Sequence, residues 1–355
     1  MDDSQAQISK TNKYTRRTFL QTSALAAGGI LFHGCMSSSN QTEKLVEVLH
    51  LPKRFSRRHG EFTANITGVL APEVKKVRYQ LNDGKWIEFS QEGPRVPPPL
   101  FVLELRAEEL RPGTNELNIE AKAGLAQPEL TTVQFEYDPT PIKLPISIDW
   151  SNPELDVQDG SWEIFEDNGQ KRVRPTPGFE DYDRILAVTG AFAGGRRVET
   201  DVIFRSNTKK GKYGFGVLPI WGGHPDDLGV SPRRGWSYGL GWFYSKYNGV
   251  GNEFSYKYSD QPFEWVNSYR GLDLKEGVRY LITVECLPEV DQARRHTGYL
   301  QRLKWQTEGE QTSAQWIELI DTEGSPLAPG EYAVGLLAHR CQVDFGPVTI
   351  TSIEA

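Results

Sequence analysis

Residues 235–260 read GWSYGLGWFYSKYNGVGNEFSYKYSD, and this stretch decides how the C-terminal part of the chain folds. In an extended strand, residues i and i+2 share a face. The bulky side chains between 236 and 244 therefore line one face, and small residues, mainly glycine, line the other. Residues 213–217 repeat the design, with Tyr, Phe and Val alternating with two glycines. The sequence predicts strands with one bulky face and one nearly bare face.

The bulky face has two interpretations. It is either the core of a β-sandwich, because aromatic residues supply much of its buried area, or a solvent-facing platform. We favour the core interpretation for Tyr213, Phe215, Tyr238, Leu240 and Trp242. The bare face needs its own explanation, because glycine weakens a strand and often marks the close approach of a ligand. Such glycines also mark bends, and a curved sheet that takes a ligand on a shallow concave face or at its strand ends would account for both faces.

Short alternating segments continue from residue 148 to the C-terminus. So many strands over about two hundred residues predict a large two-sheet jelly roll. The closing run GEYAVGLLAHRCQVDFGPVTITSI, residues 330–353, resembles the last strands of concanavalin A-like lectin/glucanase domains. This resemblance implies a concanavalin-like jelly roll over residues 148–355.

Residues 61–138 carry an earlier set of short alternating strands, including a hairpin signal at residues 77–84. The run LRPGTNELNIEAKAG, residues 110–124, is similar to the late strands of bacterial immunoglobulin-like modules. The resemblance implies an immunoglobulin-like β-sandwich, joined to the jelly roll by a Pro-rich linker at residues 139–147. We expect an all-β chain with an immunoglobulin-like β-sandwich followed by a larger concanavalin-like jelly-roll sandwich.

The N-terminus carries a targeting pattern. TRRTFLQ, residues 15–21, opens an apolar stretch that is too short to span a membrane, and it resembles the twin-arginine translocation signal. FHGC, which ends at Cys35, resembles a lipoprotein cleavage box. We expect a twin-arginine-type signal peptide at residues 1–34 and a polar tether at residues 35–60. Cys35 is the expected lipidation site, with ordinary cleavage or an uncleaved anchor as alternatives, in an exported periplasmic or cell-surface lipoprotein.

The net charge and the cysteine content limit the classes of partner that we expect. The net charge is −7, and removal of residues 1–34, with four basic and two acidic side chains, leaves −9. Phosphate binding needs a basic face, so we do not expect nucleic acid as a partner. Cys286 and Cys341 lie in apolar runs, as two buried residues or as a disulfide formed after export. The chain lacks Cys and His spacings of the zinc type.

The strongest binding signal is PIWGGHPDDLGVSPRRGW, residues 219–236, which predicts a long Gly- and Pro-rich loop. Aromatic rings stack on sugars while charged side chains bond their hydroxyl groups. The predicted carbohydrate-binding residues are Trp221, His224, Asp226, Asp227, Arg233, Arg234, Trp236, Tyr244, Tyr247 and Trp265. The alternative is a loop whose Asp and Arg side chains hold its own shape. Asp226 and Asp227 are also weak candidates for a Ca²⁺ site, and we expect no other cofactor or metal.

Glu199 and Asp201 share a strand face, similar to the first part of the Glu-x-Asp-x-x-Glu signature of laminarinase-like glycosidases. The third carboxylate would fall at Phe204, whereas retaining hydrolysis needs two carboxyl groups about 5 to 5.5 Å apart. Both residues are therefore weak catalytic candidates, and a solvated strand face is the favoured interpretation.

Taken with the loop, these features predict an exported, cell-envelope carbohydrate-binding protein with a glycan as its partner, reaching the membrane only through Cys35. The alternatives are a polysaccharide-degrading enzyme, either a glycoside hydrolase or a lyase, that uses the same cleft, and a non-catalytic structural surface module.

Overall fold

The computed structural model describes residues 44–354 apart from short gaps. The gaps are residues 61, 90–98, 153, 179–182, 208–212, 225–232, 234, 236–238, 248–249, 258–263, 270–273, 291, 293–295, 310–315 and 322–329. In the described residues the regular elements are strands and one 3₁₀ helix, η1 (Ala107–Glu109). The same residues contain no helix with the length and apolar character needed to cross a membrane.

The N-terminal strands form two sheets around one hydrophobic cluster. The first sheet has the order β1 (Val46–His50), β3 (Ala64–Leu70), β6 (Leu100–Leu105). The second has the order β2 (Arg54–Ser56), β8 (Glu129–Asp138), β7 (Gly113–Ala123), β4 (Val74–Leu81), β5 (Ile87–Glu88). Ile66 and Leu103 from the first sheet share this cluster with Leu117 and Phe135 from the second. We call this unit the N-terminal sandwich.

The N-terminal sandwich begins earlier than predicted. Strands β1 and β2 lie within residues 35–60, the predicted polar tether. Val46 and Phe55 are buried, and the Phe55 ring lies edge-on to Phe135 with centroids 5.2 Å apart. The tether assignment is therefore wrong for these strands. They were not predicted because their apolar segments are short and the sequence around Phe55 is rich in basic residues. Similarly, β9 (Ile146–Ile148) begins inside the predicted linker.

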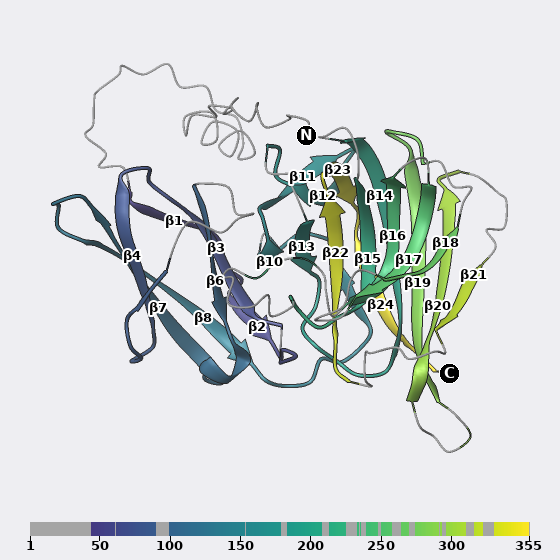
Figure 1. The fold of residues 1–355 in the computed structure, drawn as a ribbon, viewed down its shortest axis with the longest axis horizontal. Coiled ribbons are helices and arrows are strands. Elements are labelled where there is room, and N and C mark those ends of the chain that lie inside the picture. The colour runs from purple at the N-terminus through teal and green to yellow at the C-terminus, as the bar shows by residue number, and fades with distance from the viewer. Residues whose placement is uncertain are drawn as a thin grey trace, which may run out of the picture. The chain divides into compact units, whose positions relative to one another are not determined.

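The C-terminal strands form two larger sheets (Figure 1). The seven-stranded sheet has the order β10 (Asp156–Asp159), β13 (Asp183–Ala187), β22 (Ala333–His339), β15 (Gly214–Trp221), β16 (Gly239–Tyr247), β17 (Val250–Lys257), β18 (Glu264–Tyr269). The nine-stranded sheet has the order β11 (Trp162–Asp167), β12 (Gln170–Pro175), β23 (Cys341–Phe345), β14 (Gly195–Asn207), β19 (Arg279–Val290), β20 (His296–Thr307), β21 (Ile317–Asp321), with β24 (Val348–Ile353) paired to β14 and β9 paired to β24. A large hydrophobic cluster draws on both sheets. The all-β class, with a smaller sandwich followed by a larger one, is confirmed.

The bulky face of β15 and β16 is core, as favoured. Tyr213, Phe215 and Trp242 all belong to the large cluster. Buried Leu240 belongs to a smaller cluster, and Tyr238 lies outside the described residues.

The bare glycine face does not receive a ligand, and this expectation is wrong. A Cβ atom on Gly214 would lie 2.5 Å from the Phe243 ring, and one on Gly241 would lie 3.0 Å from a methyl group of Leu218. Phe243 and Leu218 are buried with Phe62 in a hydrophobic cluster on this side of the sheet. The glycines therefore make room for two apolar side chains of the protein itself.

The two cysteines are buried without a disulfide between them. Cys286 belongs to a small cluster with Tyr299, whereas Cys341 belongs to the large cluster and donates to the carbonyl of Gly214 at 3.1 Å. Burial raises the pKa of Cys286 to about 12, so this thiol stays protonated and unreactive. The interpretation as two buried core residues is confirmed.

Candidate functional site

Two predicted binding aromatics are core residues. Trp221 is fully buried, and its ring centroid lies 4.8 Å from that of Phe62 and 5.5 Å from that of His224. Tyr244 is also buried, and its hydroxyl accepts the backbone N–H of Leu274 at 3.3 Å. Neither ring is available to a sugar, so both assignments are wrong.

Two polar candidates anchor the chain instead of facing solvent. His224 is buried, and its ring nitrogens Nδ1 and Nε2 lie 2.5 Å and 3.2 Å from the carbonyl oxygens of Gly235 and Gln158. Arg233 is buried as well, and its backbone N–H donates to Glu104 of β6 at 2.9 Å. Only the contact with Gly235 lies within the loop, whereas Gln158 and Glu104 belong to β10 and β6, so these contacts tie the loop to other strands.

The other predicted positions are not placed. Asp226, Asp227, Arg234, Trp236 and the lipidation candidate Cys35 lie outside the described residues. Tyr247 and Trp265 belong to β16 and β18, of which only the backbone is described at these positions. Within the described ranges, no group of three or more His, Cys, Asp or Glu side chains is arranged to hold a metal ion. The predicted Ca²⁺ ligands, Asp226 and Asp227, lie outside the described residues.

Asp201, a catalytic candidate, is an ion-pair anchor. It lies on the outer face of the nine-stranded sheet, is buried, and accepts from Arg279 at 2.8 Å and 2.9 Å and from the Arg172 guanidinium. The hydrogen bond to Asp201 raises the pKa of Arg279. Both oxygens of this carboxylate already accept hydrogen bonds from guanidinium groups, so it is not open to a substrate as an acid or a nucleophile. The catalytic assignment is therefore wrong for Asp201, whereas Glu199 is exposed on the same face.

Glu199 belongs to a row of outward side chains on four neighbouring strands, β24, β14, β19 and β20. Val198, Ile282 and Leu303 are in the core, so the residues that alternate with them point away from it. The row consists, in the order of direct cross-strand pairing, of Thr349, Glu199, Thr283 and Lys304, and it ends on Trp316. The Lys304 ammonium lies 5.9 Å from the centroid of the Trp316 ring. We call this set the trough row.

The first four members of the trough row line a hollow of about 350 Å³. On one side is a ladder of ion pairs, Arg197–Glu285 at 2.5 Å, Glu285–Arg302 at 3.5 Å and Arg302–Glu318 at 3.0 Å. On the other side lie Leu281 and Gln306. Leu281 is 43% exposed, so the hollow combines polar groups with open apolar surface, and the Trp316 ring, 38% exposed, lies next to it beside Lys304.

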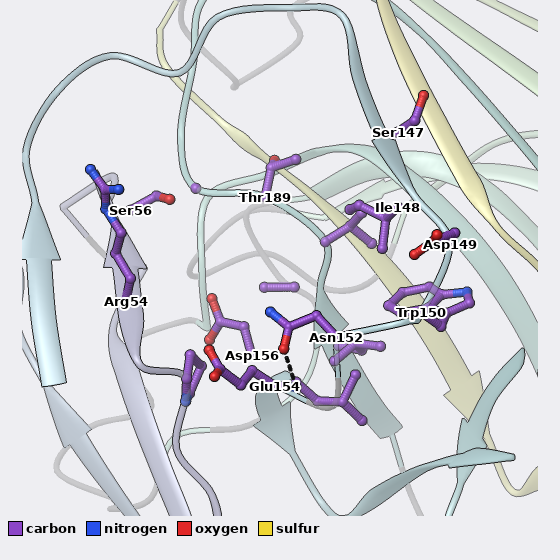
Figure 2. Close-up of a pocket in the computed structure, with 16 residues that line it drawn as sticks. Arg54, Ser56, Ser147, Ile148, Asp149, Trp150, Asn152, Glu154, Asp156 and Thr189 are labelled. Carbon is purple, nitrogen blue, oxygen red and sulfur yellow. Dashed lines mark hydrogen bonds between the residues drawn. The ribbon is translucent and has the colours of Figure 1, made fainter. Parts of the chain in front are cut away.

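A second hollow, of about 300 Å³, lies between β2 and the segments 147–156 and 186–190 (Figure 2). Its carboxylates are already bound by the protein. Asp149 accepts from Ser151, Glu154 from Lys53, and Asp156 from Arg58.

The aromatic ring in this second hollow also contacts the protein itself and is not open to a ligand. Trp150 is buried, and its indole N–H donates to the carbonyl of Gly346 at 2.7 Å. Its φ of 59° lies in the left-handed region, which a bulky residue rarely adopts. This hollow thus offers a ligand fewer open groups than the trough row does.

No protein-family model matches the chain, and no curated protein matches it. Three solved structures illustrate its structural similarities. They are a carbohydrate binding module, CBM66 from Bacillus subtilis (14% identity, 56% of this chain, 95% of that chain, TM-score 0.35), the Lotus tetragonolobus seed lectin (10%, 59%, 97%, 0.39), and the VIP36 exoplasmic/lumenal domain bound to Ca²⁺ and Man3GlcNAc (12%, 60%, 92%, 0.40). At these low TM-scores the ligand of this chain has to be inferred from its own side chains.

Of the trough row, only Glu199 was among the candidate residues predicted from the sequence. The available signal was alternation in β20, where Arg302, Lys304 and Gln306 interleave with apolar Leu303 and Trp305. Alternation shows that one face is polar, but it does not show which other strands lie beside it.

Proposed function

We propose that this chain is a saccharide-binding protein and that the trough row is its contact surface. The observation that carries the proposal is that hydroxyl, carboxylate and ammonium groups line one hollow in a row, and that an exposed Trp316 lies beside the last of them, Lys304. An indole ring stacks on the apolar face of a sugar ring, and the polar groups exchange hydrogen bonds with its hydroxyls. This surface replaces the loop at residues 219–236 as the candidate site.

The trough row supports binding without hydrolysis. Retaining glycosidases need two carboxyl groups that act on one bond. Of the two carboxylates that line the hollow, Glu199 is open, whereas Asp201 is occupied by Arg172 and Arg279. A lone open carboxylate accepts hydrogen bonds from sugar hydroxyls, which is a binding role.

Trp316→Ala is expected to abolish retardation of the protein in gels that contain a bound polysaccharide, because loss of the row's aromatic contact weakens binding by about tenfold or more. The measurement is affinity electrophoresis of residues 41–355 through neutral and acidic polymers. Trp86→Ala is the matched control, because Trp86 is 36% exposed and also lies under a cation, the Arg78 guanidinium at 4.7 Å.

Equal retardation of Trp316→Ala and wild type would show that the trough row is not the contact surface. If no polymer retards the wild type, the alternative of a structural surface module is favoured. Release of reducing ends or unsaturated products in parallel samples would instead indicate an enzyme.

We also propose export by the twin-arginine route and attachment to the membrane through an acyl group on Cys35. The arginine pair at residues 16–17 and the motif before Cys35 support this. Replacing both arginines with lysine is expected to retain the precursor in the cytoplasm. Cys35→Ala is expected to move the exported protein from the membrane to the soluble fraction, and membrane attachment of Cys35→Ala would contradict lipidation.

A further inference from the structure

We infer that the trough row selects an uncharged, extended polysaccharide chain over an acidic one. This inference rests on the proposed function and adds the class of ligand. It follows from the charge balance of the outer face and from the direction of the row across the strands.

The charged groups on both sides of the trough row are already neutralised. In the ladder, Arg197 and Arg302 are matched by Glu285 and Glu318. A guanidinium paired with a carboxylate contributes little net positive charge, so the pair attracts an acidic sugar only weakly. The ladder is therefore a neutral wall and not a basic patch.

The opposite side is balanced in the same way. Asp201 pairs with Arg172 and Arg279, and Arg279 also pairs with Glu308 at 2.6 Å. Two cations thus face two anions. Neither wall of the hollow supplies the excess of positive charge that would attract a polyanion.

Within the trough row itself, Glu199 and Lys304 carry one charge of each sign. They flank Thr283, which pairs directly with both. An acidic chain that lay along the row would gain one contact with Lys304 and place a like charge beside Glu199. The two threonine hydroxyls, by contrast, both donate and accept, as sugar hydroxyls do.

The row also fits an extended ligand. Neighbouring strands lie about 4.8 Å apart. The row takes four such steps, from Thr349 to the backbone of Trp316 beside Lys304, and therefore covers about 19 Å. Trp316 directly precedes Ile317, which pairs with Leu303 on the neighbouring strand. A chain that crosses the strands therefore meets polar groups along its length and an indole ring at one end.

The test exchanges the sign of one charge. Glu199→Lys leaves two ammonium groups in the trough row and no open carboxylate. We expect wild type to be retarded by at least one neutral polymer among a β-glucan, a galactomannan and a xylan, and not by alginate or polygalacturonate. We expect Glu199→Lys to bind a polyuronate about tenfold more tightly than wild type, because charge-assisted hydrogen bonds replace a repulsion. Added salt should remove this gain.

Glu108→Lys is the matched control. It makes the same change of charge on η1 of the N-terminal sandwich, where the Glu108 side chain is 65% exposed. Equal polyuronate retardation of Glu199→Lys and Glu108→Lys would overturn the inference, because net charge alone would explain it. Strong retardation of wild type by a polyuronate would overturn it as well.

The two proposals fail in different ways. If Trp316→Ala abolishes binding but wild type binds polyuronates, the trough row is the site and only the ligand class is wrong. If Trp316→Ala binds as wild type does, or wild type binds no polymer, the proposed function fails and the inference fails with it.

Discussion

Trp221→Ala is expected to lower the free energy of unfolding by about 3 to 5 kcal/mol and to leave polysaccharide binding by the folded protein unchanged. The Trp221 ring is fully buried between the outer face of the seven-stranded sheet and Phe62 of the N-terminal sandwich. Its loss removes apolar contacts and leaves a cavity that the strands cannot close. Urea unfolding and gel retardation of the same sample measure the two quantities.

Trp86→Ala is the control for this substitution too, since the exposed Trp86 ring should contribute less than about 1 kcal/mol to stability. The contrary result would be a Trp221→Ala protein of wild-type stability that no longer binds polysaccharide. It would place Trp221 in the binding site and would return the function to the loop at residues 219–236.

The burial of Trp221 could not be predicted from the local sequence pattern. Alternation correctly assigned Phe215 and Trp242 to the core, because period-two patterning is a local property. Trp221 follows a shift of register in β15. The shift comes after Val217 in the pairing with β16 and after Leu218 in the pairing with β22, so Trp221 falls outside that alternation. Its partner Phe62 is far away in the sequence, and nothing near Trp221 indicates that contact.

The trough row could not be predicted from the sequence for a related reason. The shared face of Glu199 and Asp201 was predictable from their spacing. Asp201 is bound by Arg172 and Arg279, which leaves Glu199 as the open carboxylate. This arrangement depends on the strand order of the sheet, in which β19 neighbours β14 and β23 separates β12 from it. Strand order depends on long-range pairing, so composition and spacing cannot supply it.

Two titratable groups near the contact between the sandwiches should give stability opposite dependences on pH. Burial lowers the pKa of His50 from its ordinary 6.5 to about 4, and its Nε2 accepts the backbone N–H of Trp162 at 3.3 Å, which requires the neutral ring. Burial raises the pKa of Asp159 from 3.8 to about 6, although an Arg184 nitrogen lies 3.3 Å from its carboxylate.

The sign of each contribution follows from which state binds more protons. Between about pH 4 and 6.5 the unfolded state protonates His50 more than the folded state does, so this residue makes stability rise with pH. Between about pH 4 and 6 the folded state protonates Asp159 more, so this residue makes stability fall as pH rises. Each contribution amounts to about 3 kcal/mol across its window, and in wild type the two largely cancel.

His50→Gln and Asp159→Asn should therefore separate the two slopes. Relative to wild type, His50→Gln is expected to lose stability as pH rises from 4 to 6.5, because wild type alone is relieved of the cost of keeping His50 neutral in the folded state at low pH. Asp159→Asn is expected to gain stability relative to wild type over the same change, because no buried carboxyl has to ionise. Urea unfolding at several pH values gives both slopes, and parallel curves for all three proteins would contradict this account of the contact.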